Sequence, residues 1–217
     1  MLKNLTTVAV SLLGMAATST ATLPTPSFAT TSNLETRLTE VIKIQETATK
    51  EVAPTEKPKE KRLTCVGCNS YELSTLTALQ ERGITDKLAL ATIMGNIKQE
   101  SQFIPNVCEG GRRIPYSSCR SGGYGIIQFT SSDRYYGLGE HAARIGGDPS
   151  SFETQLDYVF TEKQWQRIED KLKVPNKPIN FYMRLAFEWL GWGIKGPRET
   201  YARQYLDKFS YEVADSR

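Results

Sequence analysis

Histidine is nearly absent from this chain, whose 217 residues contain only His141. A catalytic triad based on histidine could form only through that residue, and no serine stands in a nucleophile-elbow context. His141 lies in a helical pattern, where we expect a solvent-exposed position. The sequence therefore gives little support to a serine hydrolase.

An excess of either charge is also lacking. From residue 63 onward, 19 Lys and Arg residues stand against 18 Asp and Glu residues, a net charge of 19 − 18 = +1. Nucleic-acid binding depends on a basic face that neutralises phosphates, and this balance implies none. We therefore expect no nucleic acid among the partners.

Long apolar runs are missing too. The longest one near the start, residues 5–17, is shorter than the ~20 residues of a membrane-spanning helix. Lys3 precedes it and the small residues of Ser27-Phe28-Ala29 follow it, which is the layout of a signal peptide. We predict that residues 1–29 are a signal peptide and that the exported mature protein has no membrane span. A retained membrane anchor is the alternative.

The four cysteines are an even number, which in an exported chain favours disulfides. Cys108 and Cys119 enclose an irregular, glycine-rich loop, so we predict a bond between them and a second bond between Cys65 and Cys68. Crossed pairings stay open. A structural zinc site is the other alternative, but His141 does not complete one. We expect no metal and no cofactor.

Composition divides the rest of the chain into a linker and a domain. Residues 30–64 are rich in Thr, Glu and Lys and predict a solvated tether with at most one short helix. Residues 65–217 form the expected domain. Apolar residues at helical spacing predict helices over 71–82, 86–100, 131–145, 151–172, 179–191 and 197–213. The run "GGYGIIQFT", residues 122–130, predicts a short strand. The expected fold class is α+β, predominantly α-helical.

Glu100 occupies an unusual place for an acid, the last turn of the second predicted helix. Helix C-terminal carbonyls carry partial negative charge, and Ile97, Phe103 and Ile104 are close in sequence. Both influences favour a protonated carboxyl group. Such a group can protonate a leaving-group oxygen as a general acid. A surface glutamate paired with Lys98 or another neighbour is the alternative.

The glycine-rich run over 122–130 supports a binding role. Its glycines let a ligand approach the backbone closely. Tyr124 offers a flat face, and the Gln128 amide offers both a donor and an acceptor. Sugars need such partners because they combine apolar ring faces with hydrogen-bonding edges. A plain β-turn is the alternative interpretation.

The tryptophans have a simpler explanation. Trp165, Trp189 and Trp192 lie in helical stretches and are expected to fill the core. The segment "WLGWGIKGP", residues 189–197, is the place where one of them would reach a sugar, because its glycines break the helix beside two tryptophans.

Three segments together resemble the phage tail lysozyme family of the lysozyme-like superfamily. They are "ATIMGNIKQESQFIPN", "GGYGIIQFTSSDRYYGL" and "GGDPSSFETQLDYVFTE", and the resemblance covers about residues 72–210. It implies a lysozyme-like fold in which a small β-hairpin or sheet lines a cleft, and an enzyme that cleaves peptidoglycan glycan strands. It also implies that Glu100 is the catalytic acid and that Tyr124 and Gln128 belong to the cleft-lining strand.

A second catalytic group is less defined. Glu109, in the loop between the first two motifs, is a candidate acid and substrate-binding residue, whereas Asp133 is better explained as a helix cap. The leading interpretation is a lysozyme that cleaves the MurNAc–GlcNAc β-1,4 bond. Alternatives are a lytic transglycosylase, a non-catalytic glycan-binding module and a structural tail or surface protein. The expected location is the periplasm, cell wall, extracellular space or a virion.

Overall fold

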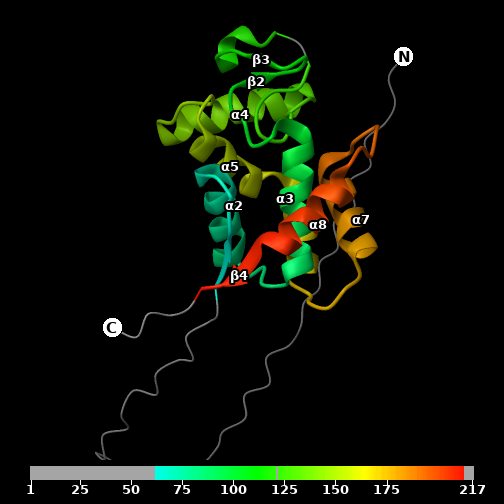
Figure 1. Cartoon of the computed structure of the whole chain (residues 1–217). Coiled ribbons are helices and arrows are strands. Elements are labelled where there is room, and N and C mark those ends of the chain that lie inside the picture. The colour runs from blue at the N-terminus through cyan, green and yellow to red at the C-terminus, as the bar shows by residue number, and fades with distance from the viewer. Residues whose placement is uncertain (1–61, 121, 213–217) are drawn as a thin grey trace, which may run out of the picture. The chain divides into compact units, whose positions relative to one another are not determined.

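The computed structural model describes residues 62–120 and 122–212 (Figure 1). The predicted signal peptide and nearly all of the predicted tether lie outside the described residues. Helices dominate the described part, and two small antiparallel sheets accompany them, which confirms the expected α+β class. No helix in this part of the chain is long and apolar enough to cross a membrane.

The described part of the chain contains seven α-helices, one short 3₁₀ helix and four short strands. The helices are α2 (Ser70–Glu81), α3 (Lys87–Ser101), α4 (Ser132–Ile145), α5 (Phe152–Thr161), α6 (Lys163–Leu172), α7 (Ile179–Leu190) and α8 (Arg198–Lys208), with a short 3₁₀ helix at Tyr116–Ser118. The strands are β1 (Leu63–Cys65), β2 (Val107–Cys108), β3 (Arg112–Arg113) and β4 (Phe209–Tyr211). β1 pairs with β4 and β2 pairs with β3, both antiparallel.

The central helix of the domain is α3, which packs against α2, α7 and α8 (Figure 1). Every residue from Ala89 to Ile97 is buried, so this stretch has no solvent-exposed side. Asp86 starts the helix, because its carboxylate accepts hydrogen bonds from two backbone N–H groups of the first turn. Gly95 allows α8 to come close, since an added Cβ would lie only 2.5 Å from the backbone nitrogen of Ala202.

Two of the predicted helices have different bounds. The stretch 151–172 forms two helices, α5 and α6, because Glu162 between them has an extended backbone. Its buried carboxylate accepts two hydrogen bonds from Arg134, at 2.6 and 2.7 Å. This ion pair holds the break in place. The predicted final helix ends at Lys208, because the next three residues form β4 on the edge of β1.

The predicted strand over residues 122–130 is wrong. The segment consists of turns, and Tyr124 makes only an isolated bridge to Cys108. Gly125 and Gln128 have φ angles of 77° and 52°, which an extended strand does not allow. The β-hairpin of this region is formed by β2 and β3 instead.

Two of the three tryptophans fill the interior as expected, whereas Trp192 lies outside the helices and is only partly buried, so its predicted place in the core is wrong. Trp165 and Trp189 pack edge to face with 5.0 Å between their ring centres, and both are buried. The prediction of an exposed His141 is wrong, since its side chain is 3% exposed. Its Nδ1 lies 2.7 Å from Arg144 and its Nε2 lies 2.8 Å from Asp157. Because arginine can only donate, Nδ1 is the acceptor, and Nε2 donates to the carboxylate.

Candidate functional site

A cleft of about 820 Å³ opens at the C-terminal end of α3. Its wall is assembled from segments that are far apart in the sequence: the end of α3, the end of the glycine-rich run, the starts of α4 and α6, the end of α7 with the loop that follows, and the start of α8. Glu100 lines this cleft. Other residues of its lining are Ile127, Gln128, Arg134, Glu188, Trp192 and Ile194.

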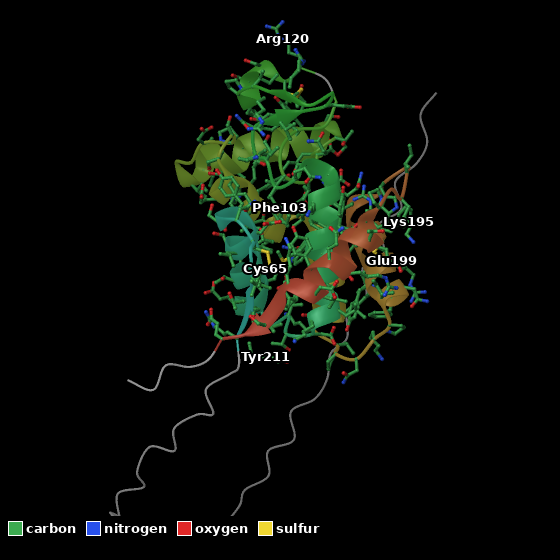
Figure 2. All side chains as sticks on the ribbon, viewed as in Figure 1. Cys65, Phe103, Arg120, Lys195, Glu199 and Tyr211 are labelled. Carbon is green, nitrogen blue, oxygen red and sulfur yellow. A yellow bond between two sulfur atoms is a disulfide. The ribbon has the colours of Figure 1, made fainter. Side chains whose placement is uncertain are left out.

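The end of α3 is formed by two consecutive residues in the left-handed region. Gln102 has φ 56° and Phe103 has φ 63°, and neither is glycine. Such residues are uncommon and concentrate at functional sites, because the surrounding structure must offset their strain. Here the turn sends Phe103 into the interior (Figure 2), where it is 1% exposed. Glu100, one turn earlier, is left at the cleft.

Two side chains join the end of α3 to the glycine-rich segment. The Ser101 hydroxyl donates to the carbonyl of Ile126 at 2.7 Å. The fully buried Gln155 accepts from the Ile126 N–H at 2.8 Å and donates to the carbonyls of Pro105 and Pro149. These bonds fix the backbone just before Ile127 and Gln128, two cleft-lining residues. The juxtaposition of the two sequence motifs therefore has a specific structural cause.

The carboxylate of Glu100 is paired with a buried guanidinium group. Its Oε1 lies 2.6 Å from Nη2 of Arg198, the first residue of α8. The side chain of Glu100 is 15% exposed and that of Arg198 is 5% exposed. The sequence-based expectation of apolar surroundings for Glu100 is therefore wrong, because a cation lies in direct contact with it.

Of the two predicted substrate-binding residues of the glycine-rich run, Gln128 lies at the cleft and Tyr124 lies in the core. Gln128 lines the cleft, and its Nε2 donates to the carbonyls of Gly125 at 3.0 Å and Val107 at 3.3 Å. Tyr124 is completely buried, and its hydroxyl donates to the carbonyl of Ile114 at 3.1 Å. A sugar cannot stack on this ring, so the position of Tyr124 does not support its predicted role in substrate binding.

The two other predicted carboxylates do not line the cleft. Glu109 accepts a hydrogen bond from the Gly123 N–H at 3.1 Å, so its carboxylate holds the glycine-rich segment. This position does not support the predicted role of Glu109 as second acid or substrate ligand. Asp133 lies in the first turn of α4, and the side chain that caps this helix is Ser131.

A family model described as phage tail lysozyme matches residues 71–209, which is more than half of the chain. The chain belongs to the phage tail lysozyme family. No curated protein and no solved structure gives a significant match. Membership of this lysozyme family implies a cell-wall-degrading enzyme, a glycosidase or transglycosylase, with peptidoglycan as its substrate. The resemblance noted in the sequence is confirmed.

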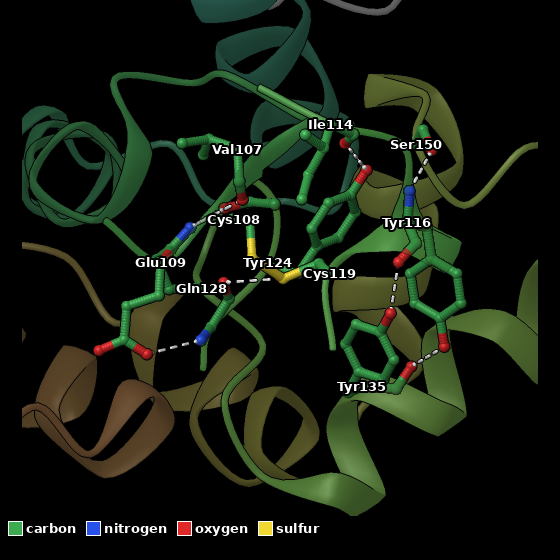
Figure 3. The surroundings of a disulfide bond; sticks show 12 residues. Val107, Cys108, Glu109, Ile114, Tyr116, Cys119, Tyr124, Gln128, Tyr135 and Ser150 are labelled. Atoms are coloured by element: carbon green, nitrogen blue, oxygen red, sulfur yellow. Dashed lines mark hydrogen bonds between the residues drawn. A yellow bond between two sulfur atoms is a disulfide. The ribbon is translucent and has the colours of Figure 1, made fainter. Parts of the chain in front are cut away.

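The loop between the two motifs is closed by a disulfide between Cys108 and Cys119 (Figure 3). Beside it, the Tyr116 and Tyr135 rings stack with 4.3 Å between their centres. Each hydroxyl donates to the backbone carbonyl of the other residue. Burial raises the pKa of Tyr116 from 10.0 to about 12. The loop is thus fixed to α4 both covalently and by packing. Cys65 is bonded to Cys68, so both predicted pairings are confirmed.

Besides Arg134, which pairs with Glu162, sequence reasoning missed two charged residues of the cleft. Arg198 is the first, and its only signal was Pro197, which precedes it and marks a helix start. The second is Glu188 on α7, which lines the cleft and pairs with Lys171 at 3.3 Å. An exposed acid on an amphipathic helix gives no indication of the cavity that it borders. The predicted place for a sugar contact, the segment after Trp189, does line the cleft.

A second hollow, of about 530 Å³, is lined by Tyr71, Asn106, Asp148 and Glu153 among others. Neither Glu100 nor Gln128 contributes to it. Asp148 accepts a hydrogen bond from the Ser150 N–H at 2.8 Å, which is a turn-stabilising role. The cleft at the end of α3 is the better candidate for the active site, because it contains the motif residues.

Proposed function

We propose that this protein cleaves the β-1,4 bond between MurNAc and GlcNAc in peptidoglycan, with Glu100 as the general acid. The observation that carries the proposal is the position of Glu100. Glu100 lies within the residues that the family model matches, and it borders the cleft together with Gln128 and Trp192. Family membership supports the substrate class, and the mixed polar and apolar lining suits a sugar.

The proposed reaction starts with proton transfer from the Glu100 carboxyl group to the glycosidic oxygen. The bond between this oxygen and the anomeric carbon breaks, and the proton leaves with the departing GlcNAc hydroxyl. A water molecule then adds to the anomeric carbon and returns a proton to Glu100. In a lytic transglycosylase the C6 hydroxyl of the same MurNAc would add instead. The bound glycan displaces water from the carboxyl group, and catalytic hydrogen bonds often tighten only in that complex.

Digestion of purified peptidoglycan, followed by mass analysis of the fragments, tests the proposal. Hydrolysis gives reducing MurNAc ends, which is the expected product. Fragments with 1,6-anhydro-MurNAc ends would assign the transglycosylase reaction to the same cleft. Binding to peptidoglycan without any soluble fragments would favour a non-catalytic glycan-binding module and contradict the proposal.

Export is the setting that we infer for this activity. The two disulfides favour an oxidising compartment, and the N-terminal residues have the pattern of a signal peptide. Peptidoglycan lies outside the cytoplasmic membrane, so location and substrate agree. N-terminal sequencing of the secreted protein would test this, since cleavage after Ala29 is expected.

A further inference from the structure

We propose that Arg198 is a positioning residue that holds the Glu100 carboxyl group in the orientation required for proton transfer. The inference rests on the proposed function of Glu100. Three described features point to it: the short ion pair, the burial of the guanidinium group and the way in which α8 is brought against α3.

The ion pair lies where the two helices meet. The Arg198 Nη2 is 2.6 Å from Glu100 Oε1, and Nη1 donates to the backbone carbonyl of Asn96 at 3.3 Å. The guanidinium carbon also lies 4.5 Å from the centre of the Trp192 ring, within cation–π range. Contacts on α3 and on the loop before α8 therefore hold the guanidinium group from several sides, while Glu100 faces the cleft.

The backbone is shaped to allow this approach. A Cβ at position 95 would lie 2.8 Å from the Arg198 carbonyl oxygen and 2.5 Å from the Ala202 nitrogen. Only glycine lets the first turn of α8 lie this close to α3. Backbone packing thus brings the Arg198 side chain within reach of Glu100.

Stability alone explains this arrangement poorly. A buried ion pair loses the hydration of both charges, and an apolar pair of similar volume is often as stable or more stable. In addition, the buried Nε of Arg198 has no hydrogen-bond partner among the described residues, which costs free energy. A group that is retained at such a cost in the wall of the cleft has a functional explanation.

Positioning is the role that the chemistry favours. Arginine stays protonated in proteins, so Arg198 cannot accept the proton of Glu100. Glu100 must then exchange its proton with the cleft, where the glycosidic oxygen would bind. The same contact limits rotation of the carboxyl group, and misplacement of a reacting group by about 1 Å can lower a rate by about 10²-fold.

Three variants test the proposal: Arg198→Gln, Arg198→Lys and the control Arg203→Gln. Arg203 also belongs to α8 but is exposed, and it pairs with Glu199 at 2.8 Å. We expect Arg198→Gln to lower the turnover of peptidoglycan by about 10- to 100-fold without weakening binding to it. Arg198→Lys should recover part of the rate, and Arg203→Gln should leave turnover and binding unchanged.

A double variant that combines Arg198→Gln with Glu100→Gln shows whether Arg198 acts through Glu100 or independently of it. If Arg198 acts through Glu100, Arg198→Gln should have no further effect on the residual rate of Glu100→Gln. Wild-type turnover in a folded Arg198→Gln variant would overturn the proposal, as would weaker binding at unchanged turnover or an equal rate loss in both backgrounds. If Arg198→Gln does not fold, Arg198→Lys decides, because unchanged turnover would overturn the role. Wild-type cleavage by Glu100→Gln would instead contradict the proposed function itself.

Discussion

At the scale of single residues, the site depends on side chains that bind the backbone of other segments. Gln155 is the clearest example, since it is completely buried and uses both ends of its amide on three different segments. Its loss would leave the Ile126 N–H and the carbonyls of Pro105 and Pro149 without this partner. Each buried polar group left unsatisfied costs about 1–3 kcal/mol.

Gln155→Ala should therefore lower the free energy of unfolding by about 2–4 kcal/mol. Urea denaturation measures this directly. Gln166→Ala is the matched control, because Gln166 is exposed and its amide donates to the Thr161 carbonyl at 3.3 Å. Equal stability of the two variants would mean that Gln155 does not hold the cleft segment.

The place of Glu100 at the end of α3 could be predicted from the sequence, but its ion-pair partner could not. A lone acid in the last turn of an apolar helix is a local pattern, and local patterns are visible in a sequence. Arg198 reaches Glu100 only through the packing of α8 on α3, and no spacing encodes that contact. The prediction that Tyr124 binds substrate depended on packing in the same way, because an aromatic residue beside glycines can face either a ligand or the core.

At the scale of elements, the close contact of α3 with α8 is the feature on which the cleft depends. Gly95→Ala would force a methyl group into the backbone of α8, which cannot rotate away. We expect the free energy of unfolding to fall by about 1–3 kcal/mol. Cleavage of peptidoglycan should also fall, because Arg198 would be displaced. Thermal unfolding checks the first part. Gly193→Ala is the control for stability, since its added Cβ would have no neighbour within 4 Å.

The disulfide loop contributes by restricting the unfolded chain. Replacement of both Cys108 and Cys119 by serine should lower stability by roughly 3 kcal/mol in the chain-entropy model, since the closed loop has about a dozen residues. Denaturation of the double variant beside the wild-type protein measures this. A loss well below 1 kcal/mol would show that packing of the loop on α4 suffices without the bond.

The stacked pair of Tyr116 and Tyr135 beside the disulfide predicts that the protein becomes less stable at high pH. Because the pKa of Tyr116 is raised to about 12 in the folded protein, the folded state keeps this proton more tightly than the unfolded state. The stabilisation of the folded state by protonated Tyr116 is complete below about pH 10 and is lost as the pH rises toward 12. The melting temperature should fall over that range, and less steeply in Tyr116→Phe. An equally steep fall in the variant would contradict the assignment.

The success of the prediction differed between elements. Helices with an apolar stripe and a clear cap, such as α2 and α3, were predicted within two residues. The break at Glu162 was not predicted, because it depends on a buried ion pair with Arg134. The strand β4 was not predicted either, because only its pairing with β1 makes it a strand.

At the scale of the whole molecule, the proposed function requires one cleft to bring Glu100 to a glycan strand. The cleft exists because residues from the middle and the end of the chain meet at the end of α3. Under the proposed function, peptidoglycan cleavage depends on Glu100, and the other lining residues bind and orient the glycan strand.

The most direct measurement is digestion of purified peptidoglycan by the wild-type protein and by Glu100→Gln, with soluble muropeptides quantified by mass spectrometry. The glutamine keeps the size of the side chain but cannot deliver a proton. General acid catalysis is worth about 10²- to 10⁴-fold, so release of fragments should fall by at least about 10²-fold while binding to peptidoglycan persists. Release near the wild-type rate by a folded Glu100→Gln variant would contradict the assignment of Glu100 as the catalytic acid.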